Sequence, residues 1–273
     1  MLSQLLQRAG IGHVVLSRTK KQRGPALGET LPPSAYALLD QLNLTALFER
    51  HGTRTFGYHA RWGSEKLSSQ EFFGQRPRPY GLKLDKAALL AGLGAATASN
   101  VVSIEAVHGI ATDADGASIT YQAGQRMCRI RAGIVVDATG RARAVVKRLG
   151  IGQQAFDSTV ATTCHVPRHR HPQLGHAVYV ESCAGRGGLV SPLVEARSAM
   201  TLFTNKGNPL LRELRHFSGW RKALSETVSL KDFLAPEHLG AIAGQPANTS
   251  RAKALAGDCW LAVGDAAIAF DPL

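Results

Sequence analysis

The most informative stretch of the sequence is WLAVGDAAIAFDPL, residues 260–273. An apolar run that is typical of a buried strand leads directly into Gly264 and Asp265, and Ala266 and Ala267 follow. Glycine permits a tight turn, aspartate can accept a hydrogen bond from a sugar hydroxyl, and small residues leave room at a helix start that favours phosphate. The stretch therefore predicts a nucleotide-binding turn, although an aspartate that caps an ordinary helix gives the same local pattern.

A second stretch, IRAGIVVDATGR at residues 130–141, repeats this design. Asp137, Ala138, Thr139 and Gly140 directly follow an apolar run that predicts a buried strand. Small residues there let a nucleotide approach the backbone at the carboxyl edge of a parallel sheet. A plain strand-to-loop turn explains either stretch alone, but the two together favour a nucleotide site.

A third stretch, GPALGETLPP at residues 24–33, places Gly28, Glu29 and Thr30 ahead of two prolines. By itself this composition is typical of a surface turn. It points to a function only in combination with the other two stretches.

Together these stretches resemble the flavin-dependent monooxygenases and tryptophan halogenases built on the hydroxybenzoate-hydroxylase-like FAD fold. The matching features follow in the family's order: RAGIGHVVLSR (8–18) with GETLPP (28–33), YGLKLDKAALLAGL (80–93) with VVDATGR (135–141), and then the final stretch. The resemblance covers nearly the whole chain and implies FAD as the cofactor. The cofactor-binding residues that it implies are Ser17, Glu29, Thr30, Ala138, Thr139, Gly140, Gly264, Asp265, Ala266, Asp271 and Pro272.

The resemblance implies an α/β architecture, in which a Rossmann-like FAD-binding fold is interleaved with a mixed-sheet substrate domain. We expect the FAD-binding unit to comprise residues 1–53, 83–152 and 251–273. The substrate unit is expected to comprise residues 54–82 and 153–250.

The chain also departs from the family's pattern. The family's first strand and Gly-rich phosphate loop would precede Met1, and an S-G-x-G segment would follow Leu273. Ser17 stands where the family usually has an acidic residue for the adenosine ribose, and a hydroxyl lacks the charge-assisted hydrogen bond of a carboxylate. We therefore expect a chain that is truncated at both ends.

Hydrophobic spacing predicts the remaining elements. Ser34 and Asp85 are expected to cap two of the helices. The sequence GLGAAT (92–97) imitates a phosphate loop but continues a helical pattern, so we reject it as one. The predicted helices span residues 2–9, 34–52, 85–100 and 208–228, and the predicted strands include 13–17, 100–107, 117–123, 128–140 and 259–264.

Composition and charge narrow the class of protein. The chain is 44% hydrophobic and 19% charged, as in globular proteins, and it has neither an apolar run long enough to span a membrane nor a signal peptide. The net charge of +12 is dispersed from Arg18 to Lys253 without a basic patch interleaved with aromatic residues. We expect a cytoplasmic protein that binds neither nucleic acid nor membranes.

No metal site is predicted. The four cysteines lack zinc-site spacing, and the histidine-rich segment CHVPRHRHPQLGH (164–176) includes Arg168 and Arg170, which would repel a cation. Pro167 also interrupts the helical spacing of His165 and His169. A solvated basic loop or a strand beside the substrate explains this segment.

The resemblance implies an FAD-dependent oxidoreductase, a monooxygenase that hydroxylates an aromatic or indole-like small molecule or a tryptophan in a partner polypeptide. Electrons would come from NAD(P)H or from a separate flavin reductase as partner. Trp62, Trp220 and Trp260 stand apart, so the Trp-x-Trp-x-x-Pro signature of halogenases is not evident, nor is their lysine. Glu29, His59 and His108 are acid–base candidates, but no spacing selects a catalytic residue.

Three alternatives stay open beside the monooxygenase. Two are enzymes: a flavin-dependent halogenase and an isoprenoid reductase. The third is a catalytically silent fragment or interaction module that keeps a residual flavoprotein fold.

Overall fold

The computed structural model describes residues 1–18, 27–95, 100–167, 177–183, 186–193, 197–234, 240 and 242–271, except for the side chains of Cys183 and Arg186. The chain packs as two compact units. Unit 1 comprises Met1–Gln22, Thr97–Thr159 and Pro246–Leu273, and unit 2 comprises Arg23–Ala96 and Val160–Gln245.

These compact units divide the chain at other residues than the predicted FAD-binding and substrate units, which stay a prediction. Residues 23–53 and 83–96 belong to unit 2. The reason is strand pairing: β2 (Thr30–Leu31) and β3 (Gly52–Thr55) flank β6 (Gly81–Leu84) in one antiparallel sheet. Which unit binds FAD and which binds substrate stays a prediction.

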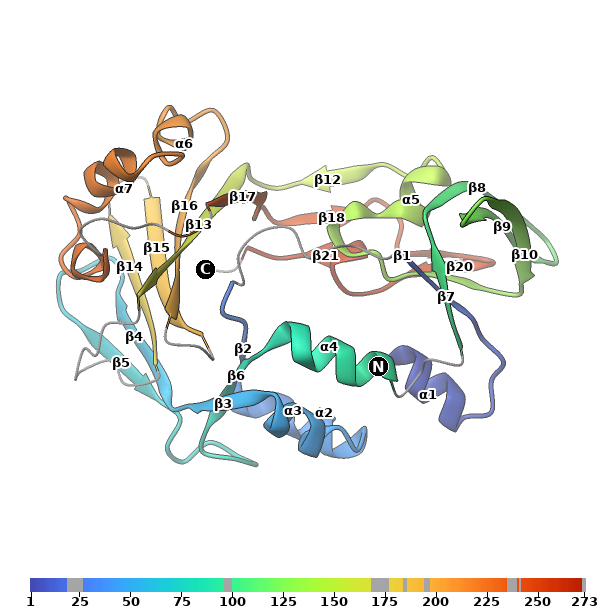
Figure 1. The fold of residues 1–273 in the computed structure, drawn as a ribbon, viewed down its shortest axis with the longest axis horizontal. Coiled ribbons are helices and arrows are strands. Elements are labelled where there is room, and N and C mark those ends of the chain that lie inside the picture. Colours follow the sequence, from blue (N-terminus) through green and yellow to red (C-terminus); the bar gives the residue numbers. More distant parts are fainter. Residues whose placement is uncertain are drawn as a thin grey trace. The chain divides into compact units, whose positions relative to one another are not determined.

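Unit 1 begins with α1 (Leu2–Arg8) and β1 (Val15–Arg18), and β1 pairs in parallel with β7 (Val101–Ile104). An antiparallel meander follows, made of β8 (Ala106–Asp113), β9 (Gly116–Ala123) and β10 (Arg126–Ala132) (Figure 1). The predicted strand over 100–107 is therefore two strands. It divides at Glu105, whose carboxylate accepts a hydrogen bond from the Gly124 amide at 2.7 Å.

The two nucleotide-type stretches of unit 1 follow neighbouring strands. β11 (Val135–Asp137) pairs in parallel with β20 (Trp260–Ala262), and β19 (Ala256–Gly257) pairs antiparallel with β20. After β11 come the short 3-10 helix η3 (Gly140–Ala142) and α5 (Ala144–Arg148). After β20 comes only the 3-10 helix η5 (Gly264–Ala266), followed by β21 (Ile268–Ala269).

The helix predicted after Asp265 is thus a single 3-10 turn. It ends early because β21 pairs antiparallel with β18 (Ser250–Ala252), whose other neighbour is β12 (Gln153–Ala155). Extended pairing and continued helix are incompatible backbone conformations. The core of this unit joins β9, β11, β20 and α5 through Ala117, Ile119, Val135, Val145, Val146, Ala252, Cys259, Trp260, Ala262 and Ala266.

Asp137 fixes the turn between β11 and α5. Its side chain is fully buried, and its Oδ1 accepts hydrogen bonds from the Thr139 N–H at 3.0 Å and the Thr139 hydroxyl at 2.6 Å. Its Oδ2 accepts hydrogen bonds from the N–H groups of Val145 and Val146 at 2.9 and 3.0 Å. The carboxylate therefore satisfies the first amides of α5, which have no partner within the helix.

In unit 2, the helices of the first sheet differ from the expected ones. The predicted helix over 34–52 consists of η1 (Pro33–Ala35), α2 (Tyr36–Gln41) and α3 (Thr45–Arg50). It breaks at Asn43, whose φ of 53° is left-handed, and Ser34 lies inside η1 and makes no side-chain cap. The cap expected of Asp85 is confirmed, because the Ala88 N–H donates to its Oδ1 at 3.0 Å at the start of α4 (Lys86–Ala95).

A seven-stranded mixed sheet forms the larger part of unit 2 (Figure 1). β14 runs parallel to β4 and antiparallel to β15. The strands, in spatial order, are β17 (Ala243–Pro246), β13 (Thr159–Pro167), β16 (Arg197–Asn205), β15 (Arg186–Pro192), β14 (Val178–Cys183), β4 (Gly57–Arg61) and β5 (Ser68–Glu71). The mixed α/β class predicted from the sequence is confirmed.

Helices α6 (Leu210–Glu213) and α7 (Phe217–Leu224), with η4 (Leu230–Phe233), pack on this sheet. They replace the single helix predicted over 208–228. The chain turns between α6 and α7, where the buried indole of Trp220 donates its Nε1–H to the Leu214 carbonyl at 2.8 Å. A continuous helix would carry this indole away from the sheet.

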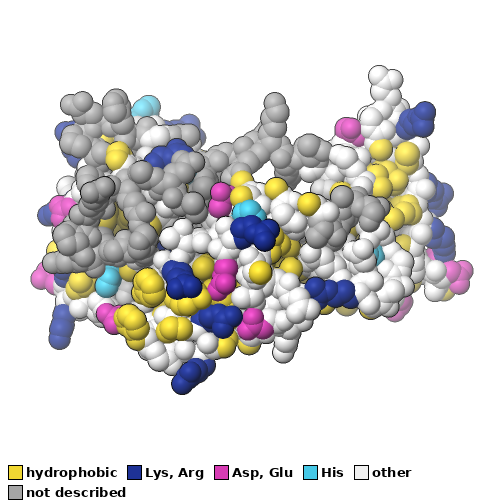
Figure 2. Space-filling view, turned by 60° about the horizontal axis from the view of Figure 1, so that its bottom comes forward, with side chains coloured by type: hydrophobic (Ala, Val, Ile, Leu, Met, Phe, Trp, Pro, Cys, Tyr) yellow, Lys and Arg dark blue, Asp and Glu magenta, His cyan; other side chains and the backbone are white. Residues whose placement is uncertain are grey.

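Surface charge in the described residues agrees with a dispersed pattern. On the face drawn in Figure 2, Lys and Arg side chains lie scattered among acidic and hydrophobic ones. Within the described ranges, no helix has the length and apolar character needed to cross a membrane.

The Asp137 contacts predict that even a substitution of similar size at this position lowers the free energy of unfolding strongly. Asp137→Asn keeps the size of the side chain but replaces one acceptor oxygen by an NH₂ group, which leaves buried amides of the turn without an acceptor. We expect the free energy of unfolding to fall by roughly 2–4 kcal/mol, the usual cost of breaking a buried charged hydrogen-bond network. Urea denaturation measures it, with Asp115→Asn at an exposed turn as the control. Equal stability of the two variants would contradict this role for Asp137.

Candidate cofactor site

The structure brings six of the predicted cofactor-binding residues together in unit 1. Because β11 and β20 are parallel neighbours, the turns that follow them emerge at the same edge of the sheet. Helices η3 and η5, which form these turns, contact each other. The six residues are Ala138, Thr139, Gly140, Gly264, Asp265 and Ala266.

The glycines of the two turns leave room for a ligand. Gly140 has a φ of 65° and Gly264 a φ of 57°, and open space lies where a Cβ would stand at each. Within the described part of the chain, the N–H groups of Gly140, Arg141, Gly264 and Asp265 have no hydrogen-bond acceptor. Clustered free amides of this kind suit the oxygens of a phosphate, so these residues fit the pyrophosphate of a dinucleotide.

Arg141 fastens the end of the described chain beside these turns. Its guanidinium donates to the carbonyls of Asn248 at 2.6 Å and Phe270 at 2.8 Å. The Asp265 carboxylate lies 3.9 Å from its Nε, and 59% of the Asp265 side chain is exposed, so this ion pair is weak. Asp271, whose N–H donates to Thr249 Oγ1 at 3.1 Å, is thereby held in the same unit, while Pro272 lies outside the described residues.

Arg143 supports the η5 turn through a hydrogen bond to its backbone, a role that the sequence does not predict. It is 2% exposed, has a left-handed φ of 49°, and donates from Nε to the Ala266 carbonyl at 3.0 Å. The rest of its guanidinium donates to Ser250 and to Gln153 Oε1. Burial, with the nearby Arg141 charge, lowers the pKa of Arg143 from its usual value.

Ala266 and Ser17, two of the predicted cofactor-binding residues, differ in their relation to the turns η3 and η5. Ala266 is fully buried in the core, so it contributes shape to the turn while its carbonyl is bonded to Arg143. Ser17 lies exposed on β1, and among the described strands β1 pairs only with β7. The structure therefore does not join Ser17 to η3 or η5 by strand pairing.

Glu29 and Thr30 belong to unit 2. Gly28 has a φ of 75°, and a Cβ there would stand 2.4 Å from Ser191 Oγ. The Ser191 hydroxyl donates to the Gly28 carbonyl at 2.8 Å, and Thr30 begins β2. The turn Gly28–Leu31 is therefore pressed against β15.

Lys83 reaches this turn from β6. It is 2% exposed, and its Nζ donates to Thr30 Oγ1 at 2.6 Å and to Ser191 Oγ at 2.8 Å. Burial in the sheet lowers the pKa of Lys83 from 10.5 to about 7. A lysine between two apolar residues in GLKL gave one signal for it, but its partners lie 53 and 108 residues away in the chain.

The acid–base candidates do not converge on one site. Glu29 pairs through Oε1 with Lys86 Nζ at 2.8 Å, and its buried Oε2 has no partner in the described part of the chain. His59 bonds to Ser69 Oγ at 2.8 Å, and exposed His108 lies 3.4 Å from Gln122 Oε1. The structure therefore selects no catalytic residue among them.

No cluster suited to a metal ion occurs among the described residues. His165 lies on β13, while residues 168–176 of the histidine-rich segment lie outside the described ranges. The absence of a metal there stays a prediction.

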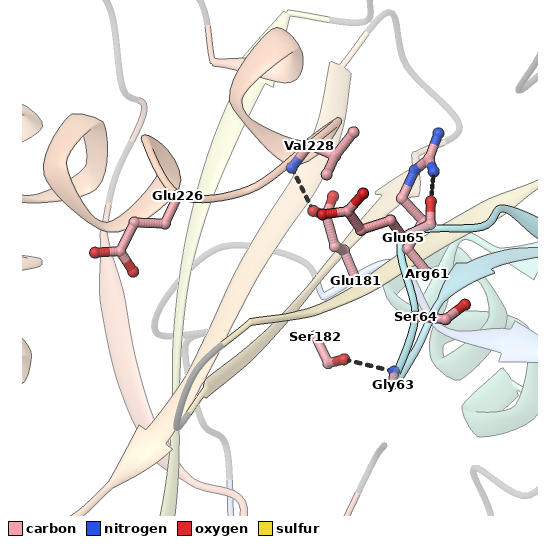
Figure 3. A pocket seen from close by; sticks show the side chains of 8 residues that line it. All are labelled: Arg61, Gly63, Ser64, Glu65, Glu181, Ser182, Glu226 and Val228. Atoms are coloured by element: carbon pink, nitrogen blue, oxygen red, sulfur yellow. Dashed lines mark hydrogen bonds between the residues drawn. The ribbon is translucent and has the colours of Figure 1, made fainter.

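A separate pocket of about 440 Å³ in unit 2 is charged but has a structural explanation (Figure 3). Its most buried acid, Glu181, is 2% exposed and accepts hydrogen bonds from the N–H groups of Val228 at 2.5 Å, Ser229 at 3.0 Å and Leu230 at 3.1 Å. The Tyr179 hydroxyl also donates to it at 3.1 Å. A carboxylate with these donors caps η4 and is poorly placed to accept a substrate proton.

Comparison with known proteins identifies the family. The family model described as "FAD binding domain" matches residues 1–272. The chain therefore belongs to this family of FAD-binding proteins, and FAD is its cofactor. No curated protein matches it in sequence.

Solved structures show the same fold at low sequence identity. The flavin-dependent halogenase CmlS is 17% identical with a TM-score of 0.83, and the match covers 99% of this chain and 52% of CmlS. The p-nitrophenol 4-monooxygenase PnpA from Pseudomonas putida DLL-E4 is 16% identical with a TM-score of 0.79, covering 99% and 70%. The peptidyl tryptophan dihydroxylase QhpG is 19% identical with a TM-score of 0.70, covering 99% and 58%. The chain thus spans about half of the length of CmlS, and its fold is that of flavin-dependent halogenases and hydroxylases.

The Gly28 geometry yields a matched test. Gly28→Ala combines a left-handed φ with a clash against Ser191, whereas Gly74→Ala, at a φ of 84°, meets open space. We expect Gly28→Ala to lower the free energy of unfolding by about 1–3 kcal/mol more than Gly74→Ala does. Thermal and urea unfolding of both variants measure the difference. Equal losses would show that the turn is not pressed against Ser191.

Lys83 predicts a dependence of stability on pH. Since its pKa is lowered to about 7 in the folded protein, the unfolded chain holds more protons between that value and 10.5, and the free energy of unfolding rises with pH in this window. Below pH 7 both states are protonated, and the cost of burying the charge is present in full. The slope contributed by Lys83 is up to about 1.4 kcal/mol per pH unit.

Urea denaturation from pH 6 to 10 tests this dependence. Lys83→Met should remove that part of the slope, and Lys66→Met, which removes an exposed lysine of the same unit, should keep it. Parallel pH curves for the unmodified protein and Lys83→Met would contradict the lowered pKa.

Proposed function

We propose that this chain is the FAD-binding and substrate-binding part of an FAD-dependent monooxygenase that hydroxylates an aromatic or indole-like group. The observation that carries the proposal is the pair of contacting turns after β11 and β20, with their open glycines and unpaired amides. Membership of the FAD-binding family supports the cofactor, and the hydroxylases among the similar structures support the reaction.

The residues of unit 1 have distinct proposed roles toward FAD. The free amides at Gly140 and Gly264 would bind pyrophosphate oxygens, and the exposed Asp265 carboxylate would accept hydrogen bonds from sugar or ribityl hydroxyls. Arg143 holds the η5 backbone in place for this contact. When bound, FAD supplies the electron transfer and the activation of oxygen, and the protein supplies orientation and exclusion of water.

Unit 2 is the proposed substrate-binding unit, and electrons would come from NAD(P)H or a separate flavin reductase. The substrate is an aromatic small molecule or, by analogy with the peptidyl tryptophan dihydroxylase QhpG, a tryptophan in a partner polypeptide. The reaction consumes one O₂, two electrons and two protons for each hydroxyl group formed, and it releases one water.

Halogenation is the second candidate, because CmlS and other halogenases share the fold. The tryptophans of this chain argue for hydroxylation. Trp62, Trp220 and Trp260 are far apart in the sequence, so they do not form the Trp-x-Trp-x-x-Pro signature of halogenases.

The first test is a titration of the 273-residue chain with FAD, followed by flavin fluorescence. We expect saturable binding with a dissociation constant of roughly 1–10 μM, or −7 to −8 kcal/mol. Gly264→Val should weaken binding at least about tenfold, because a side chain would fill the space that the ligand needs. Gly150→Val, at a φ of 73° with open space around it, introduces the same backbone strain away from η3 and η5. Equal affinities for the two variants would refute the site.

A turnover assay then separates the two reactions. An FAD-loaded protein with NAD(P)H or a flavin reductase should incorporate one ¹⁸O atom from ¹⁸O₂ into an indole or phenol substrate. A product that requires chloride or bromide and contains no ¹⁸O would establish halogenation instead.

A further inference from the structure

We propose that Lys83 is a positioning residue, whose ammonium acts through Thr30 and Ser191 to hold the Gly28–Leu31 turn, which carries the predicted cofactor-binding residues Glu29 and Thr30. Its link to FAD rests on the proposed function and on the prediction that Glu29 and Thr30 bind the cofactor, which is separate from the proposed contacts of unit 1. The contacts on which it depends all lie within unit 2.

The geometry makes Lys83 the junction of three chain segments. Its Nζ donates to Thr30 Oγ1 on β2 and to Ser191 Oγ on β15, and the Ser191 hydroxyl in turn donates to the Gly28 carbonyl. The backbone adds to this, because the Leu84 N–H donates to the Glu29 carbonyl at 3.0 Å and Thr30 lies opposite Lys83 in the strand register. Every residue from Gly28 to Thr30 is thus tied to β6 directly or through Ser191.

A positive charge at this place is not needed to build the sheet. A buried ammonium costs free energy unless it is paired, and no carboxylate lies within ion-pairing distance of Nζ among the described residues. An apolar side chain of similar length would fill the space without this cost. The charge therefore has a role beyond packing, and its two acceptors, Thr30 Oγ1 and Ser191 Oγ, are the groups on which it acts.

The ammonium and the neutral amine hold the turn differently. The ammonium has donors only, so both hydroxyl oxygens must face it, and the Ser191 hydrogen is directed to the Gly28 carbonyl. The neutral amine is a weaker donor and offers a lone pair, which competes with the Gly28 carbonyl for that hydrogen. Loss of the proton should loosen the turn.

Other charged groups surround this sheet, and none is recorded as a partner of Lys83 in the described chain. Glu29 pairs with Lys86, and Arg54 lies over the Tyr80 ring. The charged residues of the elements packed against or adjoining β6 and β15 are Glu29, Glu49, Arg50, His51, Arg54, Asp85, Lys86, Glu181, Arg197, Lys231 and Asp232.

The test uses NMR on the unliganded, unmodified chain, with ¹³C-labelled lysine and threonine methyl groups. We expect the Lys83 Cε resonance and the Thr30 methyl resonance to titrate together with a midpoint near pH 7. In Lys83→Met the Thr30 titration should vanish, and in the control Lys66→Met it should persist. A Thr30 resonance that ignores the Lys83 titration would overturn the proposal without any variant being needed.

FAD affinity supplies the second readout. We expect the unmodified chain to bind FAD about tenfold more weakly at pH 9 than at pH 6, and Lys83→Met to show the weaker affinity at both. If the Lys83 and Thr30 resonances titrate together but the chain does not bind FAD, the proposed function is refuted and the positioning of the turn by Lys83 still holds. FAD affinity that changes equally with pH in both proteins would refute the role of Lys83.

Discussion

A single buried carboxylate determines the shape of the candidate cofactor site. Asp137 stands at the end of β11, where its carbonyl accepts the Val263 N–H at 3.0 Å and its side chain accepts the first amides of α5. The carbonyl links the ends of the two parallel strands, and the carboxylate turns the chain sharply into η3 and α5. The free amides of both turns therefore take their direction from this residue, which itself need not touch a ligand.

Three of the buried charges in the described residues, Asp137, Arg143 and Lys83, differ in how they are compensated. Asp137 and Arg143 are surrounded by hydrogen-bonding groups, including backbone N–H groups for the first and backbone carbonyls for the second. Such charges stabilise one backbone geometry, and removing either side chain leaves its own hydrogen-bond partners unsatisfied. Lys83 has only two hydroxyls, which explains why burial lowers its pKa so far. Fixed charges thus shape unit 1, while unit 2 contains a charge that can titrate near neutral pH.

The sequence predicts the local parts of this arrangement and misses the distant ones. The turns at Gly140 and Gly264 can be predicted because each needs only a local pattern, in which an apolar strand is followed by a glycine and small residues. The helix break at Asn43 was missed, since a leucine-rich pattern continues through it and only the left-handed φ interrupts it. The helix expected after Asp265 fails for a reason that lies elsewhere, in the pairing of β21 with β18.

The residues that hold the turns could not be found by pattern for the same reason. Arg141 and Arg143 are two positions apart and look equivalent in the sequence, yet one binds the carbonyls of Asn248 and Phe270 and the other is buried against Ala266. These partners lie more than one hundred residues away, and only the fold brings them together. A site whose proposed ligand contacts are backbone amides also places few demands on side-chain identity. Proteins only 16–19% identical to this chain have the same fold. What reaction such a protein performs is then decided by side chains outside the two turns, so hydroxylation and halogenation must be distinguished by their products and not by the cofactor site.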